Sequence, residues 1–246
     1  MYSAHPNVVP PTDNARLWRY MDVIKFVSLL ATSKLAFTRL NLFDDPFEGS
    51  WPRRHVEAYG QWMRESKVPI TPDMANRSIF GPRWSYQTAA CCWHKSQHES
   101  AAMWKLYLKA DQGIAVQTTF ARLSKSITDK VDVYVGEVRY IDYDEDIFPD
   151  NHGFTVALHK RKSFDHEKEV RALVYGQGSA GHPDAPMAPV ASIEVDLPTL
   201  IETVVVSPMT QTWQLDLIAD LVGRYGGAFP VLRSSIMLTP YQVKPN

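Results

Sequence analysis

The sequence predicts a single α+β domain in which helices pack on a mixed or antiparallel sheet. Short segments with alternating apolar residues, typical of strands, are interspersed with amphipathic segments of helical spacing. No internal repeat and no clear linker divides the chain. Its 246 residues, 45% of them hydrophobic, are enough for a substantial core. We expect a flexible N-terminal arm over 1–16 and one globular domain over 17–246.

The first elements follow from local patterns. Residues 17–20 alternate as in a strand, and Asp22 is suited to cap the helix that follows. The apolar positions expected on one face of that helix are Ile24, Val27, Leu29 and Leu30. Later strands are predicted over 34–40, 84–94, 113–120, 131–143, 166–175 and 230–238, and residues 192–208 are predicted as strand, turn and strand. Later helices are predicted over 53–67, 97–110, 121–127, 152–164 and 210–226. The face predicted for the last helix comprises Trp213, Leu217, Ile218 and Leu221. Residues 41–52, 68–83 and 176–190 are rich in turn formers and are predicted as loops or connections.

Composition excludes several classes of protein. The net charge of −1 gives no general reason to expect a nucleic-acid or membrane partner, and no apolar run is long enough to cross a bilayer. The N-terminus does not resemble a secretion signal, and the two cysteines are adjacent, so they make no disulfide framework. A cytoplasmic protein is the simplest expectation. The oligomeric state does not follow from the sequence.

The stretch "CCWHKSQHESAAMWKLY", residues 91–107, is the first candidate site. Cysteine and histidine bind zinc, but Cys91 and Cys92 should lie on opposite faces of a strand, and no second cluster exists, so no metal is predicted. Ser96 and Glu99 match a capping box. Cys92 and His94 share a face, which leaves a cysteine nucleophile as a minor alternative. Trp93 and His94 remain as a candidate pocket wall beside a helix N-terminus suited to an anion. Further residues of this wall are Glu99, Ser100, Trp104 and Tyr107.

The segment "KRKSFDHEKEVRALVY" is the second candidate. A strand here places Glu167, Glu169 and Arg171 on one face, preceded by Lys160 and Arg161. One interpretation is a solvated face with ion pairs. The other is a cleft with two carboxylates, of which one has a raised pKa or stabilises a cation.

The turn "FDDPFEGSW" is the third candidate. Asp44, Asp45 and Glu48 resemble a metal or sugar site, although Asp-Pro turns commonly use the aspartate to satisfy backbone donors. Glycine-rich phosphate loops and the G-x-S-x-G nucleophile motif are absent from the sequence.

Three segments together resemble an uncharacterised bacterial family, number twenty-nine seventy-one of the domain-of-unknown-function series. These segments lie between Leu17 and Tyr175: "LWRYM…FVSLLATSKLAFTRLNLFDDPFEGSW", "CWHKSQHESAAMWKLYLKADQGIAV" and "HKRKSFDHEKEVRALVY". This family implies no established activity.

The opening strand, with Arg19 followed by a helix and a strand, is similar to the start of ADP-ribosyltransferase-like domains. That resemblance implies NAD as a candidate substrate, Arg19 at the early position and Glu167 or Glu169 as the late carboxylate. A fixed carboxylate stabilises the cation that forms on ribose as nicotinamide leaves. The middle of the chain departs from the pattern, because it lacks the Ser-Thr-Ser strand.

The leading hypothesis is a cleft that binds a nucleotide, NAD or another small anion and acts on a glycosidic bond. Its candidate catalytic residues are Glu169, Glu167, Arg19 and His94. Its candidate binding residues are Tyr20, Asp45, Glu48, Trp93, Glu99, Ser100, Trp104, Tyr107, Lys160, Arg161 and Arg171. Within this set Arg19 and Lys160 would hold phosphates, and Trp93 or Trp104 would stack on a base. The alternatives are a non-enzymatic interaction module of a stress or phage-defence system and a phosphodiesterase or nuclease holding Mg²⁺ on Asp44, Asp45 and Glu48.

Overall fold

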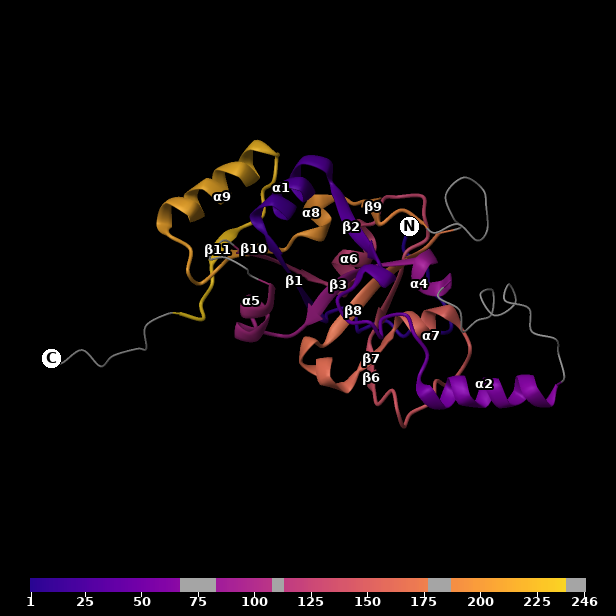
Figure 1. Ribbon diagram of the computed structural model, residues 1–246. Coiled ribbons are helices and arrows are strands. Elements are labelled where there is room, and N and C mark those ends of the chain that lie inside the picture. The colour runs from indigo at the N-terminus through magenta and orange to yellow at the C-terminus, as the bar shows by residue number, and fades with distance from the viewer. Residues whose placement is uncertain (67–82, 108–112, 177–186, 238–246) are drawn as a thin grey trace, which may run out of the picture.

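The computed structural model describes residues 1–66, 83–107, 113–176 and 187–237 (Figure 1). These residues form one compact domain with a large, mostly antiparallel sheet and helices packed against it (Figure 1). The predicted α+β class is confirmed.

The large sheet has the order β11-β10-β4-β1-β3-β2-β9, and β8 pairs with β3 and β5. Its strands are β1 (Arg16–Asp22), β2 (Lys34–Arg39), β3 (Thr88–Lys95), β4 (Gly113–Thr119), β5 (Tyr134–Glu137), β8 (Glu169–Tyr175), β9 (Val190–Glu194), β10 (Thr203–Val206) and β11 (Val231–Arg233). The pairs in this sheet are antiparallel, except for the parallel pair β10–β11. A second, parallel pair joins β6 (Arg139–Ile141) and β7 (His159–Arg161).

Helices cover both faces of the large sheet. They are α1 (Val23–Thr32), α2 (Arg53–Glu65), α4 (Arg83–Gln87), α5 (Ala101–Tyr107), α6 (Phe120–Ser126), α7 (Gly153–Ala157), α8 (Leu197–Leu200) and α9 (Thr212–Arg224), with 3-10 turns η1 (Leu40–Leu42) and η2 (Lys162–Glu167). Side chains of α1, α6, α8 and α9 form the main core with one face of the sheet, and α7 and η1 contribute to a smaller core on the other face.

Alternation along β3 divides its residues between these two cores. Cys91 and Trp93 lie in the main core, whereas Ala90 and Cys92 belong to the smaller one. The two cysteines therefore lie on opposite faces, as the sequence predicts, because successive strand side chains alternate. Both are free thiols.

The beginning of α1 matches its prediction. The Asp22 side chain accepts a hydrogen bond from the Lys25 amide at 2.7 Å, which satisfies one of the free donors of the first turn. The predicted apolar face is partly wrong: Phe26, rather than Ile24, is buried with Leu29 and Leu30, and Ile24 is 82% exposed.

The helix predicted from residue 97 begins four residues later than expected. Ser96 accepts a hydrogen bond from the His98 amide, and the Met103 amide donates to the Ser100 hydroxyl. Ser100 thus occupies the capping position, and the predicted Ser96–Glu99 capping box is wrong. The Glu99 carboxylate instead accepts from the indole of Trp104 and from Ser235 near the end of the described chain.

Two predicted elements are each divided in the structure. The strand predicted over 131–143 breaks at Val138, because β5 pairs with β8 whereas β6 pairs with β7. The helix predicted over 152–164 is helical only over α7, and the chain then forms β7 and η2. Long-range pairing, which local periodicity does not report, decides both cases.

Three further predictions are corrected. Residues 84–87, predicted as the start of a strand, belong to α4. The strand predicted from residue 166 begins only at Glu169, because Lys168 has a left-handed backbone with φ of 42°. In α9 the buried residues are Ile218 and Val222, whereas Trp213 and Leu217, predicted on the core face, are exposed.

The predicted N-terminal arm lies along the domain. Tyr2 bridges to Val133, the Ser3 hydroxyl donates to Asp132, and Val8 is buried in the smaller core. The predicted connection over 68–82 and most of the loop over 176–190 lie outside the described residues. No helix in the described residues is long and apolar enough to span a membrane.

Candidate active site

The large sheet opens at the middle of β3. β1 pairs with β3 only near its end, where Trp18 faces His94, and β2 pairs with it only near its beginning, where Thr38 faces Ala90. Within the described chain, residues 91–93 pair with neither strand on this edge, whereas the opposite edge of β3 pairs with β8. A cleft forms where β1 and β2 separate from β3.

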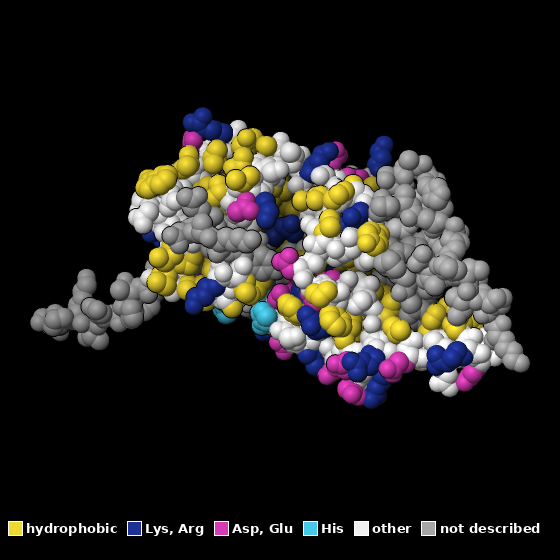
Figure 2. Space-filling view, viewed as in Figure 1, with side chains coloured by type: hydrophobic (Ala, Val, Ile, Leu, Met, Phe, Trp, Pro, Cys, Tyr) yellow, Lys and Arg dark blue, Asp and Glu magenta, His cyan; other side chains and the backbone are white. Residues whose placement is uncertain are grey.

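The cleft has a volume of about 710 Å³. That size suits a small ligand, since ligand pockets are commonly about 300–1,000 Å³. In the view of Figure 2, acidic and basic side chains gather around a hollow near the centre of the molecule. Nine of the fifteen candidate catalytic and binding residues of the leading hypothesis line the cleft: Arg19, Tyr20, Asp45, Glu48, Trp93, His94, Lys160, Glu167 and Glu169.

A buried ionic cluster forms one wall of this cleft. Lys160 on β7 pairs with Glu167 at the end of η2, and its Nζ lies 3.4 Å from Glu48 Oε1 and 3.7 Å from Glu169 Oε1. The loop after η1 supplies Glu48, and the first residue of β8 is Glu169. Segments distant in sequence therefore bring three carboxylates around one lysine.

Arg171 binds two of these carboxylates, Glu48 and Glu169, from the side away from the cleft. Its Nη2 lies 2.7 Å from Glu48 Oε1 and 2.6 Å from Glu169 Oε2, and its Nη1 donates to Glu48 Oε2 and to the Ala157 carbonyl at 2.8 Å. The side chain of Arg171 is fully buried. Arg171 does not line the cleft, so it fixes the carboxylates from behind instead of meeting a ligand.

The charges of the cluster do not balance. Three carboxylates, Glu48, Glu167 and Glu169, face two cations, Lys160 and Arg171. Burial alone would raise the pKa of Glu169, but Arg171 and Lys160 hold it below its ordinary value. Glu169 is therefore ionised at neutral pH, and one of the three carboxylates has no cation of its own.

The two neighbouring glutamates have opposite pKa shifts. Burial, together with the charge of Glu169, raises the pKa of Glu167 above its ordinary value, whereas the pKa of Glu169 is lowered. For Lys160, burial would lower the pKa, but Glu169 and Glu48 raise it, so the ammonium stays charged. Carboxylates whose pKa values are pushed apart are typical of sites in which one exchanges a proton and the other stabilises charge.

His94 lies at the edge of the ionic cluster in a defined tautomer. Its Nδ1 lies 2.6 Å from the backbone carbonyl of Glu167 and must donate to that oxygen, since a carbonyl only accepts. Burial lowers the pKa of His94, so the ring is neutral at neutral pH. Nε2 is then a hydrogen-bond acceptor, which a ligand hydroxyl or water can use.

Cys92 and Tyr20 complete the polar lining in their protonated forms. Burial and the adjacent Glu169 raise the pKa of the Cys92 thiol well above its ordinary value, and the thiol donates to Glu169. A Cys92 nucleophile, considered as an alternative, is disfavoured because the thiolate is the reactive form. Burial raises the pKa of Tyr20 to about 12, and its hydroxyl accepts from the Ser100 amide at 2.9 Å.

Comparisons with known proteins yield only a distant structural likeness. The chain is similar to solved structures of DarT from Thermus sp. 2.9. The complex with ADP-ribosylated ssDNA has 9% identity and a TM-score of 0.42 over 92% of this chain and 97% of that one. The complex with NAD+ has 9% identity and a TM-score of 0.41 over 92% of this chain and 97% of that one. The complex with carba-NAD+ has 8% identity and a TM-score of 0.40 over 91% of this chain and 97% of that one. At these scores the likeness assigns neither a function nor a residue. No family model and no curated protein matches the chain, so the predicted membership in family twenty-nine seventy-one is not confirmed.

Six of the predicted site residues do not line the cleft. Glu99, Ser100 and Trp104 contact the far side of Tyr20 or the end of the described chain, and the side chain of Tyr107 lies outside the described residues. Arg171 supports the cluster from behind, and Arg161 pairs with Asp45 at 2.7 Å. At the helix end predicted to bind an anion, the Ser100 amide donates to the Tyr20 hydroxyl and the Met103 amide donates to the Ser100 hydroxyl.

The predicted stacking and phosphate contacts also change. Trp93 and Trp104 are 1% and 3% exposed, so neither presents an open ring face to a base. Arg19 donates to protein acceptors, and Lys160 is surrounded by carboxylates. The exposed cations of the cleft lining are Lys25 on α1 and Lys34 on β2, which sequence reasoning missed because each follows an ordinary surface pattern.

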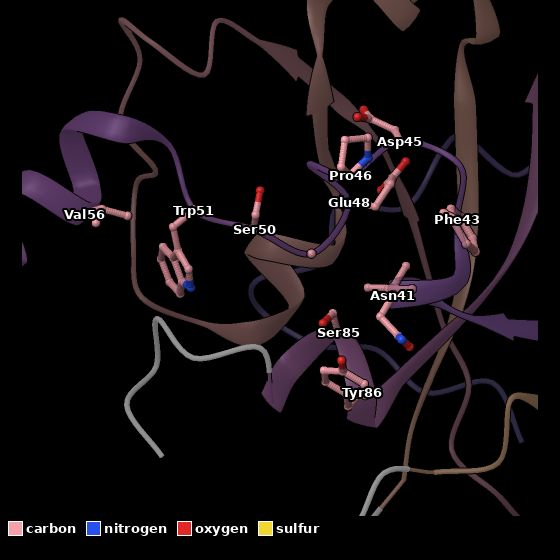
Figure 3. Close-up of a pocket in the computed structure, with 12 residues that line it drawn as sticks. Asn41, Phe43, Asp45, Pro46, Glu48, Ser50, Trp51, Val56, Ser85 and Tyr86 are labelled. Atoms are coloured by element: carbon pink, nitrogen blue, oxygen red, sulfur yellow. The ribbon is translucent and has the colours of Figure 1, made fainter. Parts of the chain in front are cut away.

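The loop with Asp45 and Glu48 lines both the cleft and a second cavity of about 410 Å³, which Figure 3 shows. In Figure 3, Asp45 and Glu48 lie on one side of this cavity and Ser85 and Tyr86 on another. Asp45 is bound to Arg161 and Glu48 to Arg171, so the oxygens of two of the three carboxylates in the Mg²⁺ hypothesis are already occupied. Among the described residues, no group of three His, Cys, Asp or Glu is placed to hold a metal ion.

Proposed function

We propose that the cleft binds NAD or a related nucleotide and that the protein acts on its N-glycosidic bond, by hydrolysis or by ADP-ribose transfer. The observation that carries this proposal is the excess of carboxylates over cations in the buried ionic cluster at one wall of the cleft. The reaction creates positive charge on the ribose, which a fixed negative environment stabilises more strongly than it stabilises the bound substrate.

Glu169 is the group proposed to stabilise this charge. The bond between C1′ of ribose and the pyridinium nitrogen breaks with both electrons moving to nitrogen, which releases neutral nicotinamide and leaves an oxocarbenium-like ribose. Glu169 is ionised and held by Arg171 from behind, so it needs no rearrangement as the charge develops.

His94 is the proposed proton acceptor. The attacking water or acceptor hydroxyl bonds to C1′ and gives up its proton. Nε2 of neutral His94, which has no hydrogen-bond partner among the described residues, can take this proton. Lys25 and Lys34 at the cleft rim, in place of Arg19 and Lys160, are proposed to meet the diphosphate. Both are exposed, with surface partners Asp22 and Glu194 that a phosphate can displace at small cost.

The test compares Glu169→Gln with the wild-type protein and with a control, Glu137→Gln. Glu137 is a surface glutamate paired with Lys95. Nicotinamide release is measured by chromatography, and NAD binding is measured by calorimetry. Glu169→Gln is expected to lower kcat by about 10²–10³-fold with a Kd for NAD that changes little, because the amide keeps the shape and loses the charge. Glu137→Gln should behave as wild type.

Two outcomes would contradict the proposal. Unchanged turnover in Glu169→Gln removes the role of the carboxylate. A wild-type protein that neither binds nor turns over NAD or other nucleotides leaves the interaction-module hypothesis in its place. The cluster would then be an internal set of ion pairs.

A further inference from the structure

The contacts of Arg19 set it apart from the other charged residues of the cleft. Its Nη1 donates to the Cys92 carbonyl at 3.2 Å and contacts the Cys91 thiol, and its Nη2 donates to the Ala36 carbonyl at 3.2 Å. The guanidinium also lies 5.9 Å from the centre of the Trp93 ring. Every contact therefore joins β1 to β2 or β3.

The two carbonyls belong to residues that would face each other in a continuous sheet. β2 and β3 pair with Thr38 opposite Ala90, and the same register continued by two residues places Ala36 opposite Cys92. The described pairing stops before that point. One planar guanidinium with two forked nitrogens fills the position where the next ladder hydrogen bonds would form.

β1 leaves β3 at the same place. Its pairing with β3 ends at Trp18 opposite His94, and continuation would place Tyr20 opposite Cys92. Both neighbours thus diverge around Cys92, and Arg19 sits between all three strands. Without a donor there, the Cys92 and Ala36 carbonyls would be left unsatisfied beside a partly buried wall, which is unfavourable.

We infer that Arg19 is a brace that holds β2 and β3 apart and so keeps the cleft open, and that it does not contact the substrate. The cleft lining includes Arg19 together with Ala36 and Cys92, so closing the two strands would remove this part of the cleft. Arg19 is then a positioning residue. Its role in catalysis rests on the proposed function, but its role in the sheet does not.

Hydrogen exchange tests the brace without any ligand. In a strand, the amide and carbonyl of one residue point to the same edge, so the Ala36 and Cys92 amides face the opening. In Arg19→Leu the strands are expected to pair, and these two amides should exchange about tenfold more slowly than in wild type. Arg16→Leu is the matched control, because Arg16 lies on the same strand and its Nη1 bonds only the Gln97 carbonyl in the described hydrogen bonds.

Arg19→Lys distinguishes two properties of Arg19, its forked contact with two strands and its positive charge. Lysine keeps the charge but lacks the fork, so it is expected to resemble Arg19→Leu, and it supplies the result if Arg19→Leu does not fold. Unchanged exchange at both amides in Arg19→Leu would overturn the inference. Wild-type exchange in Arg19→Lys would do the same, because a single point donor would then suffice.

Kinetics of nicotinamide release distinguish a brace from a substrate contact. Closure of the cleft lowers the fraction of binding-competent protein, so KM should rise several-fold with a nearly unchanged kcat at saturation. A lower kcat with unchanged KM and unchanged exchange would show that Arg19 acts on the transition state and would overturn the brace. If wild type has no activity on nucleotides, the proposed function fails, and the exchange experiment still decides the role of Arg19.

Discussion

Replacing Arg171 with methionine tests whether the ionic cluster is a buried structural unit. Arg171 is fully buried and binds Glu48 and Glu169, whose side chains are 1% and 5% exposed. Its removal leaves three carboxylates facing Lys160 alone. Removing one partner from a buried pair typically costs about 3–5 kcal/mol, because the remaining charge stays desolvated.

Protonation of a glutamate gives a second estimate of the free energy that the loss of Arg171 costs. One of the two released glutamates can take up a proton instead of remaining a buried anion. At pH 7, about 2.7 units above the ordinary pKa of glutamate, this costs about 3.7 kcal/mol. At pH 5 the same step costs about 1 kcal/mol. We therefore expect Arg171→Met to lose about 3–4 kcal/mol of unfolding free energy at pH 7, and considerably less at pH 5.

Urea unfolding of wild type and Arg171→Met at both pH values measures this difference. Arg224→Met is the control, because Arg224 and Asp220 form an exposed pair and its loss should cost no more than about 0.5 kcal/mol. Adding Glu48→Gln to Arg171→Met should recover part of the loss, since it removes one unpaired charge. A loss below about 1 kcal/mol at pH 7, or one that does not depend on pH, would refute the reasoning.

Three further predictions concern packing, capping and pH. Gly153→Ala should destabilise the protein by about 1–3 kcal/mol, because a Cβ there would lie 2.1 Å from the Trp84 ring. Gly223→Ala on α9, where a Cβ meets open space, should stabilise the protein by about 0.5–1 kcal/mol. Equal effects of the two variants in urea unfolding would contradict this prediction. Asp22→Ala should cost about 0.5–2 kcal/mol through loss of the α1 cap, and Asp22→Asn should restore most of it; a cost that Asn does not relieve would argue against capping. Burial lowers the pKa of His94, His152 and His159, so the unfolded chain takes up protons first as pH falls below about 6.5. Stability should be highest above that pH and decrease toward pH 5, with the His159→Gln variant showing a shallower slope; a stability that rises on acidification would contradict the assignment.

The fold class and many elements followed from local patterns. Alternation predicted the strands that became β1 and β2, the strands that became β4 and β8 were also predicted, and the Asp22 cap predicted the beginning of α1. These features depend on residues that are close in sequence, so the order of apolar and polar side chains is enough to predict them. The same periodicity did not show that the strand predicted over 131–143 divides into β5 and β6, or that the helix predicted over 152–164 ends after α7, because distant partners decide both.

The site was predicted in part. The spacing predicted one strand face for Glu167, Glu169 and Arg171, but only Glu169 and Arg171 lie on β8, and Glu167 ends η2. The interpretation as a solvated surface is excluded by the burial of all three. Glu48 and Lys160 were named as candidates, but nothing in the sequence showed that both would meet Glu169, because they come from separate segments. The capping box at Ser96 was wrong, since Ser100 offered an equally suitable oxygen one turn later.

The amino-acid sequence by itself determined the α+β class, the adjacent cysteines on opposite faces of a strand and the order of charged residues along β8. Only the tertiary structure decided that β1 and β2 separate from β3 at Cys92, and that three carboxylates surround Lys160 beside the opening. The reason is physical. Local patterns record which side of an element a residue occupies, whereas a cleft and its charge are set by where separate elements stop pairing and by which side chains are then buried together.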